Sequence, residues 1–347
     1  MYEKDGEKYF VVDEHMHYWD ASPENRNKYG EGFINCFYDY HRNLSPEEWV
    51  WPKEKFDKPS EEDLMRDLFE EGHVDKAIFA PTHLMDFYPD HGFNTVERNG
   101  ELARKYPDKF ILNGSWDPRY EEKGLEAFER QVEEWGVKGV KLYTAEWKGD
   151  SKGWKLSDPW AYRYFEKSVE LGIKNVQVHK GPTIWPLNRD SFDVADVDEA
   201  ASSFPELNFI VEHVGLPRLE DFCWIATQEP NVYGGLAVAM PFMHTRPRYF
   251  AKIIGELLYW IGEDRIMFGS DYAIWSPKWL VEGFVDFQMP EGAEFGEYAE
   301  LTPDIKRKIL GLNAASIYGI EVPEELQMAT ADQGTGFDVA EKPAADR

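Results

Sequence analysis

Two histidines, one residue apart, follow the first apolar run of the chain. The run covers residues 9–14, and His15 and His17 come at its end. Successive side chains on a strand point to opposite faces, so residues two apart share a face and the two imidazoles can converge on one point. Neutral imidazole binds zinc, iron, manganese and other divalent ions. Two ordinary histidines near a surface loop would give the same short pattern, so the interpretation depends on the rest of the chain.

Three later apolar runs also lead into a residue of metal-ligand type. They are residues 173–178 before His179, residues 207–212 before His213, and residues 265–270 before Asp271. Each run has the length of a short buried strand and is followed by loop residues such as glycine and proline. A fourth run, 137–143, contains Lys141 in a segment too apolar for a bare ammonium group. The repetition indicates that strand ends deliver these side chains to a common place.

The order of the apolar runs predicts an α/β fold, a (β/α)₈ TIM barrel. Helix-like stretches separate most of the runs, and strands alternating with helices imply parallel pairing through right-handed crossovers. The active site of such a barrel lies at the carboxyl ends of its strands. An open doubly wound sheet would instead require a glycine-rich turn after the first strand, where this chain has His-Met-His. The expected strands are 9–14, 74–80, 109–115, 137–143, 173–178, 207–212, 231–239 and 265–270, and the expected helices 60–72, 93–106, 125–135, 159–171 and 246–261.

This ordered set of residues resembles the amidohydrolase superfamily. The resemblance is to the amidohydrolase-related branch that includes aminocarboxymuconate-semialdehyde decarboxylase and the hydroxybenzoate and carboxyvanillate decarboxylases, and it spans roughly residues 8 to 320. It implies a metal ion held by His15, His17, His179 and Asp271, with His213 as a further ligand or as an acid/base beside the ion. The motifs that carry it are His15-Met16-His17, His179, Glu212-His213-Val214-Gly215 and Gly269-Ser270-Asp271-Tyr272.

Lys141 departs from the single-metal members of that branch. Many of its decarboxylases need no lysine on the fourth strand, whereas this chain has Lys141 where two-metal relatives carry a carboxylated bridging lysine. Lysine carboxylated by carbon dioxide is an anionic ligand with two oxygens, able to span ions about 3.5 to 4 Å apart. The first ion would then be bound by His15, His17 and Asp271, and the second by His179 and His213.

An outward orientation of Lys141 is the alternative. Its ammonium group would then reach solvent between the barrel and its helices, as we expect for Lys138. The two lysines lie an odd number of residues apart, so they face opposite sides if the strand is regular.

Composition bounds the domain organisation and the partners. The chain has 347 residues, and we expect one barrel domain over 1–327 with an insertion at about 18–59, followed by a polar tail, 328–347, that is mobile or contacts another subunit. The net charge of −27 argues against a nucleic-acid or anionic-membrane surface. Two cysteines imply no disulfide framework, which favours the cytoplasm, and neither a signal core nor a run of membrane-spanning length is present.

Aromatic residues are dense in the insertion and in several later loops. A long connection after a barrel strand lies on the active-site face, so we expect residues 18–59 to form a lid or a subunit contact, with a small satellite core as the alternative. Cations among aromatic residues beside a metal suit a small carboxylate with an apolar or aryl body. A solvated helix start would also explain the arginine among them. The candidate substrate-binding residues are His83, His91, Tyr143, Trp185, Arg246 and Trp275.

Several reactions fit this residue set, and we expect a metal-dependent hydrolase or carboxy-lyase with Asp271 and His213 as catalytic residues. In hydrolysis, Asp271 accepts a proton from water whose pKa the metal lowers. In non-oxidative decarboxylation, the metal orients a carboxylate while an acid protonates the carbon. A dinuclear iron or manganese oxygenase that hydroxylates a small molecule with dioxygen is a further alternative, as is a non-catalytic paralogue paired with an active subunit.

The expected cofactor and partners follow from the same residues. One or two divalent ions, zinc, manganese or iron, suit the ligand types, and carboxylation of Lys141 goes with two. The expected partners are a small-molecule substrate and either copies of the chain or a related barrel subunit.

Overall fold

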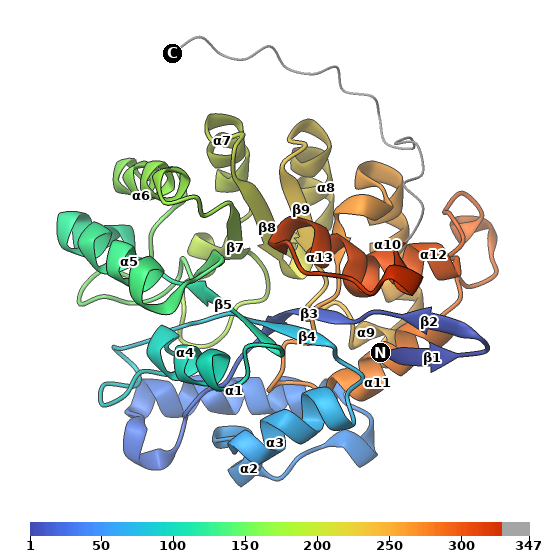
Figure 1. Ribbon diagram of the computed structural model, residues 1–347, viewed down its shortest axis with the longest axis horizontal. Coiled ribbons are helices and arrows are strands. Elements are labelled where there is room, and N and C mark those ends of the chain that lie inside the picture. The colour runs from blue at the N-terminus through green and yellow to red at the C-terminus, as the bar shows by residue number, and fades with distance from the viewer. Residues whose placement is uncertain (328–347) are drawn as a thin grey trace.

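The computed structural model describes residues 1–327, and in it eight parallel strands form one sheet that curves into a barrel (Figure 1). Each strand pairs with the next one along the chain, from β3 to β10. The segment after β10 returns to β3, where the Glu14 N–H donates to the Phe268 carbonyl (3.1 Å) and the Asp271 N–H to the His15 carbonyl (3.0 Å). The strands are β3 (Val12–Met16), β4 (Lys76–Phe79), β5 (Phe110–Gly114), β6 (Gly139–Leu142), β7 (Asn175–His179), β8 (Asn208–Glu212), β9 (Val232–Gly235) and β10 (Ile266–Met267).

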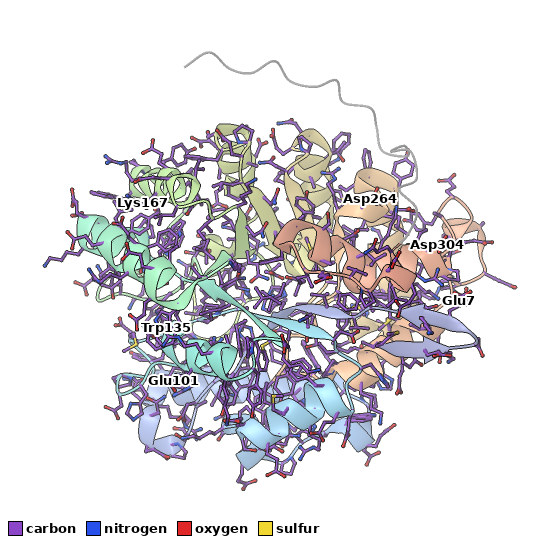
Figure 2. The ribbon with its side chains drawn as sticks, viewed as in Figure 1. Glu7, Glu101, Trp135, Lys167, Asp264 and Asp304 are labelled. Carbon is purple, nitrogen blue, oxygen red and sulfur yellow. The ribbon has the colours of Figure 1, made fainter. Side chains whose placement is uncertain are left out.

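Helices follow most of the strands and cover the outside of the barrel (Figure 1). Exposed acidic side chains such as Glu101, Asp264 and Asp304 lie on this outer layer (Figure 2), in keeping with the negative net charge. The helices are α1 (Lys28–Leu44), α2 (Lys53–Asp57), α3 (Glu61–Met65), α4 (Val96–Lys105), α5 (Glu121–Trp135), α6 (Pro159–Glu170), α7 (Asp196–Ser203), α8 (Leu219–Gln228), α9 (Phe242–Thr245), α10 (Pro247–Ile261), α11 (Pro277–Asp286), α12 (Pro303–Arg307) and α13 (Asn313–Tyr318).

The predicted barrel is confirmed, but its first strand begins later than expected, at Val12, and its last two strands end earlier than expected, at Gly235 and Met267. Residues expected to lie in one strand from position 9 are divided between a hairpin, β1 (Tyr2–Lys4) and β2 (Glu7–Tyr9), and the barrel strand β3. Asp5 and Gly6 both have positive φ, 53° and 85°. An Asp-Gly pair with two left-handed residues is a favoured two-residue hairpin turn. Here the turn pairs Tyr9 with Tyr2, so Tyr9 belongs to the hairpin and not to the barrel strand.

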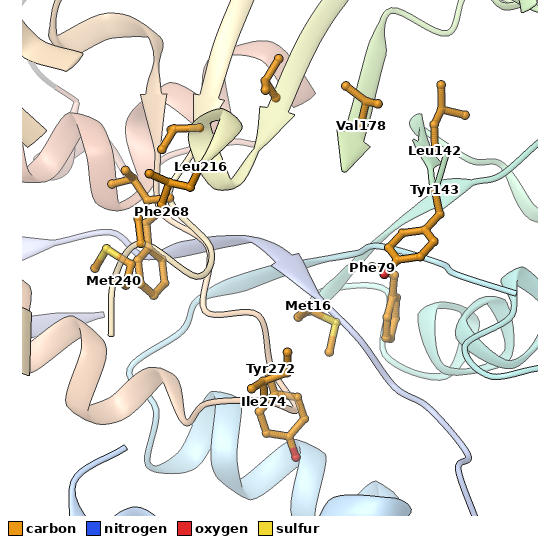
Figure 3. Close-up of a cluster of buried hydrophobic side chains, with 14 of the residues drawn as sticks. Met16, Phe79, Leu142, Tyr143, Val178, Leu216, Met240, Phe268, Tyr272 and Ile274 are labelled. Carbon is orange, nitrogen blue, oxygen red and sulfur yellow. The ribbon is translucent and has the colours of Figure 1, made fainter. Parts of the chain in front are cut away.

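The insertion after β3 contains α1 and α2 and packs into the main hydrophobic core. Asn27 caps α1, because its side chain accepts from the N–H groups of Tyr29 and Gly30. Phe33 and Ile34 of α1 are fully buried in the same cluster as the residues around the barrel. Part of that cluster is shown in Figure 3, where Leu142 of β6 and Val178 of β7 are among the labelled side chains. The insertion is therefore continuous with the core and is not a separate satellite.

None of the helices within residues 1–327 has both the length and the apolar character that crossing a membrane requires. The polar tail that the sequence suggests, 328–347, lies outside the described residues.

Candidate metal centre

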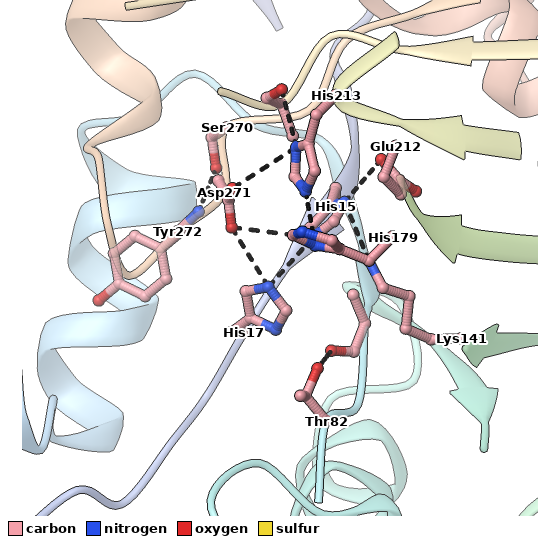
Figure 4. Close-up of polar contacts among 12 residues, drawn as sticks. His15, His17, Thr82, Lys141, His179, Glu212, His213, Ser270, Asp271 and Tyr272 are labelled. Carbon is pink, nitrogen blue, oxygen red and sulfur yellow. Dashed lines mark hydrogen bonds and ion pairs between the residues drawn. The ribbon is translucent and has the colours of Figure 1, made fainter. Parts of the chain in front are cut away.

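Six titratable side chains meet at the carboxyl ends of the barrel strands (Figure 4). All six are buried, with at most 7% of any of them exposed. His15 lies in β3 and His17 directly after it, and the remaining four come from β6, the end of β7, the residue after β8 and the segment after β10. These four are Lys141, His179, His213 and Asp271. The structure thus brings together every predicted metal ligand, including Lys141, which is fully buried while Lys138 is exposed.

Two of these residues have positive backbone φ angles, which residues other than glycine rarely adopt. The φ of His213 is 65° and that of Asp271 is 56°, and Val214 next to His213 also has a positive φ of 45°. Such angles cost about 1–3 kcal/mol each and concentrate at functional sites. Asp13 holds the loop before Asp271, because its carboxylate accepts from the backbone N–H of Ser270 at 2.8 Å and from the Ser270 hydroxyl.

The first group of ligand atoms consists of His15, His17 and Asp271. The two Nε2 atoms lie 3.0 Å apart, and Oδ1 of Asp271 lies 3.2 Å from Nε2 of His17 and 3.7 Å from Nε2 of His15. Two nitrogens that each lie about 2.1 Å from one ion, at a right angle, are about 3.0 Å apart. The spacing therefore fits a single divalent ion, and these three residues form a buried group with metal-binding geometry.

The second group consists of His179 and His213. The Nδ1–H of His213 donates to the Ala237 carbonyl (3.0 Å), and the Nε2–H of His179 donates to the Pro182 carbonyl (3.3 Å). The remaining nitrogens, Nε2 of His213 and Nδ1 of His179, face each other at 2.9 Å. In neutral rings both of these nitrogens carry lone pairs, which repel at this distance unless a cation lies beside them.

Lys141 reaches the first ligand group from β6. Its Nζ lies 3.1 Å from Nε2 and 3.4 Å from Nδ1 of His15. Burial lowers the pKa of the Lys141 amine, while the carboxyl groups of Glu212, Asp271 and Glu14 act to raise it. A lowered pKa favours the neutral amine, the form that combines with carbon dioxide.

Electrostatics favour the ligand forms of the other residues. Burial lowers the pKa of His15, His179 and His213, which keeps these imidazoles neutral. Burial alone would raise the pKa of Asp271, but His15, His17 and His213 hold it below its usual range. Neutral rings and an ionised carboxylate are the forms that bind a divalent ion.

A cavity of about 200 Å³ lies above these residues. Helix α1 forms its roof with Phe33, Phe37, Tyr40 and Leu44, and the walls include Phe93, Ile184, Phe242 and Ile274. Among the described residues that line the cavity there is no arginine, and Lys141 is the one lysine. The centre therefore faces an almost entirely apolar space.

The candidate substrate-binding residues divide into two sets. Tyr143 and Trp275 line the cavity. His83, His91, Trp185 and Arg246 do not, and Trp185 is 53% exposed while Arg246 stacks over the ring of Tyr249 at 4.4 Å. The solvated helix start describes Arg246 better than a substrate contact, because α10 begins at the next residue and the side chain is exposed.

The roof residues were not among the predicted site residues, although the sequence carries a signal for them. Positions 33, 37, 40 and 44 are apolar or aromatic and are spaced by four, three and four, as on one face of a helix. That spacing indicates an amphipathic helix, and its position after the first strand places it above the barrel mouth.

Comparison with known proteins supports the fold and the family. The Amidohydrolase family model matches residues 12–320. No curated protein matches the chain in sequence. The barrel is similar to solved structures of an uncharacterised TIM-barrel protein from Bordetella bronchiseptica (TM-score 0.67, 18% identity, 89% of this chain and 98% of that one) and 2,6-dihydroxybenzoate decarboxylase from Rhizobium (0.58, 13%, 90% and 99%). It is also similar to 5-carboxyvanillate decarboxylase from Novosphingobium aromaticivorans, solved with bound manganese (0.54, 16%, 90% and 97%).

Proposed function

The chain belongs to the amidohydrolase family, and we propose that it is a hydrolase with a two-ion metal centre that acts on a small molecule with a largely apolar body. The first ion would be held by His15, His17 and Asp271, the second by His179 and His213, with carboxylated Lys141 between them. Divalent ions at such a centre lower the pKa of water and polarise a substrate carbonyl.

One observation carries the proposal. His179 and His213 each donate one ring N–H to a backbone carbonyl, and their two remaining ring nitrogens face each other at 2.9 Å. This pair is separate from the group formed by His15, His17 and Asp271, which has its own metal-binding spacing. A group of three ligands next to a buried lysine, together with this separate histidine pair, supports two ions more strongly than one.

The chain's own residues supply proton transfer and substrate binding. Asp271 is ionised at neutral pH, because its pKa lies below the usual range, and it accepts the proton that water loses on attacking the carbonyl. The same proton then passes to the leaving group. The apolar roof and walls bind the body of the substrate and exclude bulk water. With no arginine in the lining, the polar group of the substrate faces the metal centre.

Non-oxidative decarboxylation is the second candidate. Tyr143, Trp275 and the phenylalanines of the lining suit an aryl body. Two of the structurally similar proteins are decarboxylases of aromatic acids, and one of them was solved with manganese. The similarity in fold therefore supports decarboxylation alongside the apolar lining of the cavity. Here the aryl carboxylate would face a single ion held by His15, His17 and Asp271, and His213, which is then not a ligand, would protonate the carbon as carbon dioxide leaves.

Metal content and a substrate panel test the proposal. Protein purified without added metal should contain about two zinc or manganese ions per chain by mass spectrometry of the metals, and should hydrolyse members of a panel of small aryl and alkyl esters, lactones and amides. Release of carbon dioxide from aryl carboxylates without hydrolysis would establish decarboxylation instead. Two iron ions with dioxygen uptake would establish the oxygenase alternative, and a chain without metal or turnover would be a non-catalytic paralogue.

The cellular location is proposed from the two cysteines, and the assembly from the sequence. We propose a reducing cytoplasm on the ground that Cys36 and Cys223 are both free thiols. Assembly into a homo-oligomer or with a related barrel subunit stays a prediction from the sequence.

A further inference from the structure

A layer of polar side chains lies inside the barrel, below the metal centre. TIM barrel interiors are usually filled by bulky branched apolar side chains. Here Glu14 of β3, Gln177 of β7 and Glu212 of β8 occupy the interior, and none of them has measurable solvent exposure. The metal-binding function proposed above does not use them.

Glu212 is in direct contact with a metal ligand. Its Oε2 lies 2.7 Å from Nδ1 of His15 (Figure 4). A carboxylate this close to Nδ1 favours the proton on that nitrogen electrostatically, which leaves the lone pair on Nε2. That Nε2 is the atom that faces His17 and Asp271.

Glu14 lies beside the carboxylate of Glu212, and Gln177 in turn holds Glu14. An oxygen of Glu14, an oxygen of Glu212 and a ring nitrogen of His15 all lie within 4.8 Å of one another. Gln177 Nε2 donates to Oε2 of Glu14 at 2.7 Å, and Asn113 Nδ2 donates to Oε1 of Gln177 at 2.9 Å. Close contacts and hydrogen bonds therefore connect the metal centre with polar side chains deeper in the barrel, through Glu212, Glu14 and Gln177.

Two glycines make room for this layer. A Cβ at Gly235 would lie 2.3 Å from Oε2 of Glu212 and 2.7 Å from Oε1 of Glu14. A Cβ at Gly269 would lie 3.1 Å from the same oxygen of Glu14. Gly235 is paired with Glu212 in the sheet, so any side chain there would push the carboxyl groups away from His15.

We propose that Glu212 is a positioning residue of the metal centre, which holds His15 with Nε2 toward the ion, and that Glu14 and Gln177 hold Glu212 for this task. The proposal rests on the metal-dependent function, because it assigns a role toward the ion that His15 binds. It predicts that the carboxylate layer acts on metal affinity and does not touch the substrate.

Metal affinity of purified variants tests the role. Glu212→Ala should raise the dissociation constant of the ions about 10- to 100-fold in competition with a chelator, the range typical of lost outer ligands. Glu212→Gln should lose less, because its amide oxygen can still lie against Nδ1 of His15 with its negative end toward that nitrogen. Excess metal should restore kcat in both variants, whereas KM at saturating metal should stay at the wild-type value.

A pair of glycine variants tests the role without removing a carboxylate. Gly235→Ala displaces both carboxyl groups and should also weaken metal binding. Gly283→Ala is the matched control, because the nearest atom to its Cβ would be the terminal carbon of Met243 at 3.8 Å, and it should leave affinity unchanged.

The possible failures are distinguishable. Wild-type metal affinity in folded Glu212→Gln and Gly235→Ala would overturn the positioning role while leaving the two-ion centre intact. A wild-type protein that binds no divalent ion would overturn the metal-dependent function itself and the positioning role with it.

Discussion

The floor of the cavity, which consists of the six residues of the metal centre, and its roof, which is α1, are built in different ways. On the floor, the functional side chains sit at or just beyond strand ends and contact polar neighbours. His213 donates to the Ala237 carbonyl, and His15 lies against the carboxylate of Glu212. On the roof, α1 presents mainly apolar side chains, and aromatic packing such as that of Phe33 against Phe37 holds it together. The contrast indicates that the sheet fixes the chemistry, while the inserted helix sets what fits above it.

The largest expected effect is on the floor. Replacing His15, His17, His179 or Asp271 by Ala removes one ligand from a buried centre, so activity should fall by more than about 100-fold and metal content should drop. Thermal stability in the presence of metal should fall as well, because an ion that binds only the folded state stabilises it. Full metal occupancy in His179→Ala would show that His179 is not a metal ligand.

Lys141 gives the next largest effect and tests the number of ions. Lys141→Ala should reduce the metal count from two toward one per chain, and added short carboxylates should partly restore activity by occupying the space between the ions. Lys138→Ala is the matched control, because Lys138 is exposed and outside the cavity lining. A variant that kept two ions and full turnover would show that Lys141 does not bridge them.

The same contrast explains what the sequence could predict. The floor was predictable because strand ends in a parallel barrel converge, so residue type and order along the chain suffice for His15, His179, His213 and Asp271. The roof was less predictable, because which loop side chains reach the cavity depends on packing between distant segments. Tyr143 and Trp275 line it, whereas His83 and Trp185, chosen on the same grounds, do not. The carboxylate layer was missed because a lone glutamate in a strand gives no spacing signal.

A substitution in the roof should alter specificity more than chemistry. Phe37 lines the cavity and is 7% exposed, so Phe37→Ala should cost about 3 kcal/mol of folding free energy and enlarge the space for substrate. KM for the native-sized substrate should rise, bulkier substrates should be accepted, and metal content should stay unchanged. A loss of metal in this variant would show that roof and floor are not independent.

His41 anchors the roof and makes it sensitive to pH. Its Nε2 accepts from the Trp51 N–H (2.7 Å) and its Nδ1–H donates to the Ile274 carbonyl (2.6 Å). Burial lowers the pKa of His41 to about 4. Between that value and about 6.5 the unfolded chain binds more protons than the folded one, so this contribution to stability is complete at pH 7 and is lost as the pH falls.

Urea unfolding at two pH values measures the contribution of His41. From pH 7 to pH 5 the wild type should lose about 2 kcal/mol relative to His41→Gln, which lacks the titrating ring. His244→Gln, a change at an exposed histidine, is the control and should track the wild type. Equal pH dependence in wild type and His41→Gln would mean that the ring is not a neutral anchor.

The smallest expected effect is at the junction between α1 and the loop after β7. The Tyr40 hydroxyl donates to the Thr183 carbonyl at 3.2 Å, and the ring of Trp185 lies so close to Gly32 that a Cβ there would be 2.0 Å from it. Tyr40→Phe removes one hydrogen bond of about 1 kcal/mol, so KM should rise at most about fivefold while kcat and metal content hold. The loop also carries the Pro182 carbonyl that accepts from His179. A fall in metal affinity in Tyr40→Phe would therefore mean that the junction sets the orientation of His179 and that the roof reaches the floor through this loop.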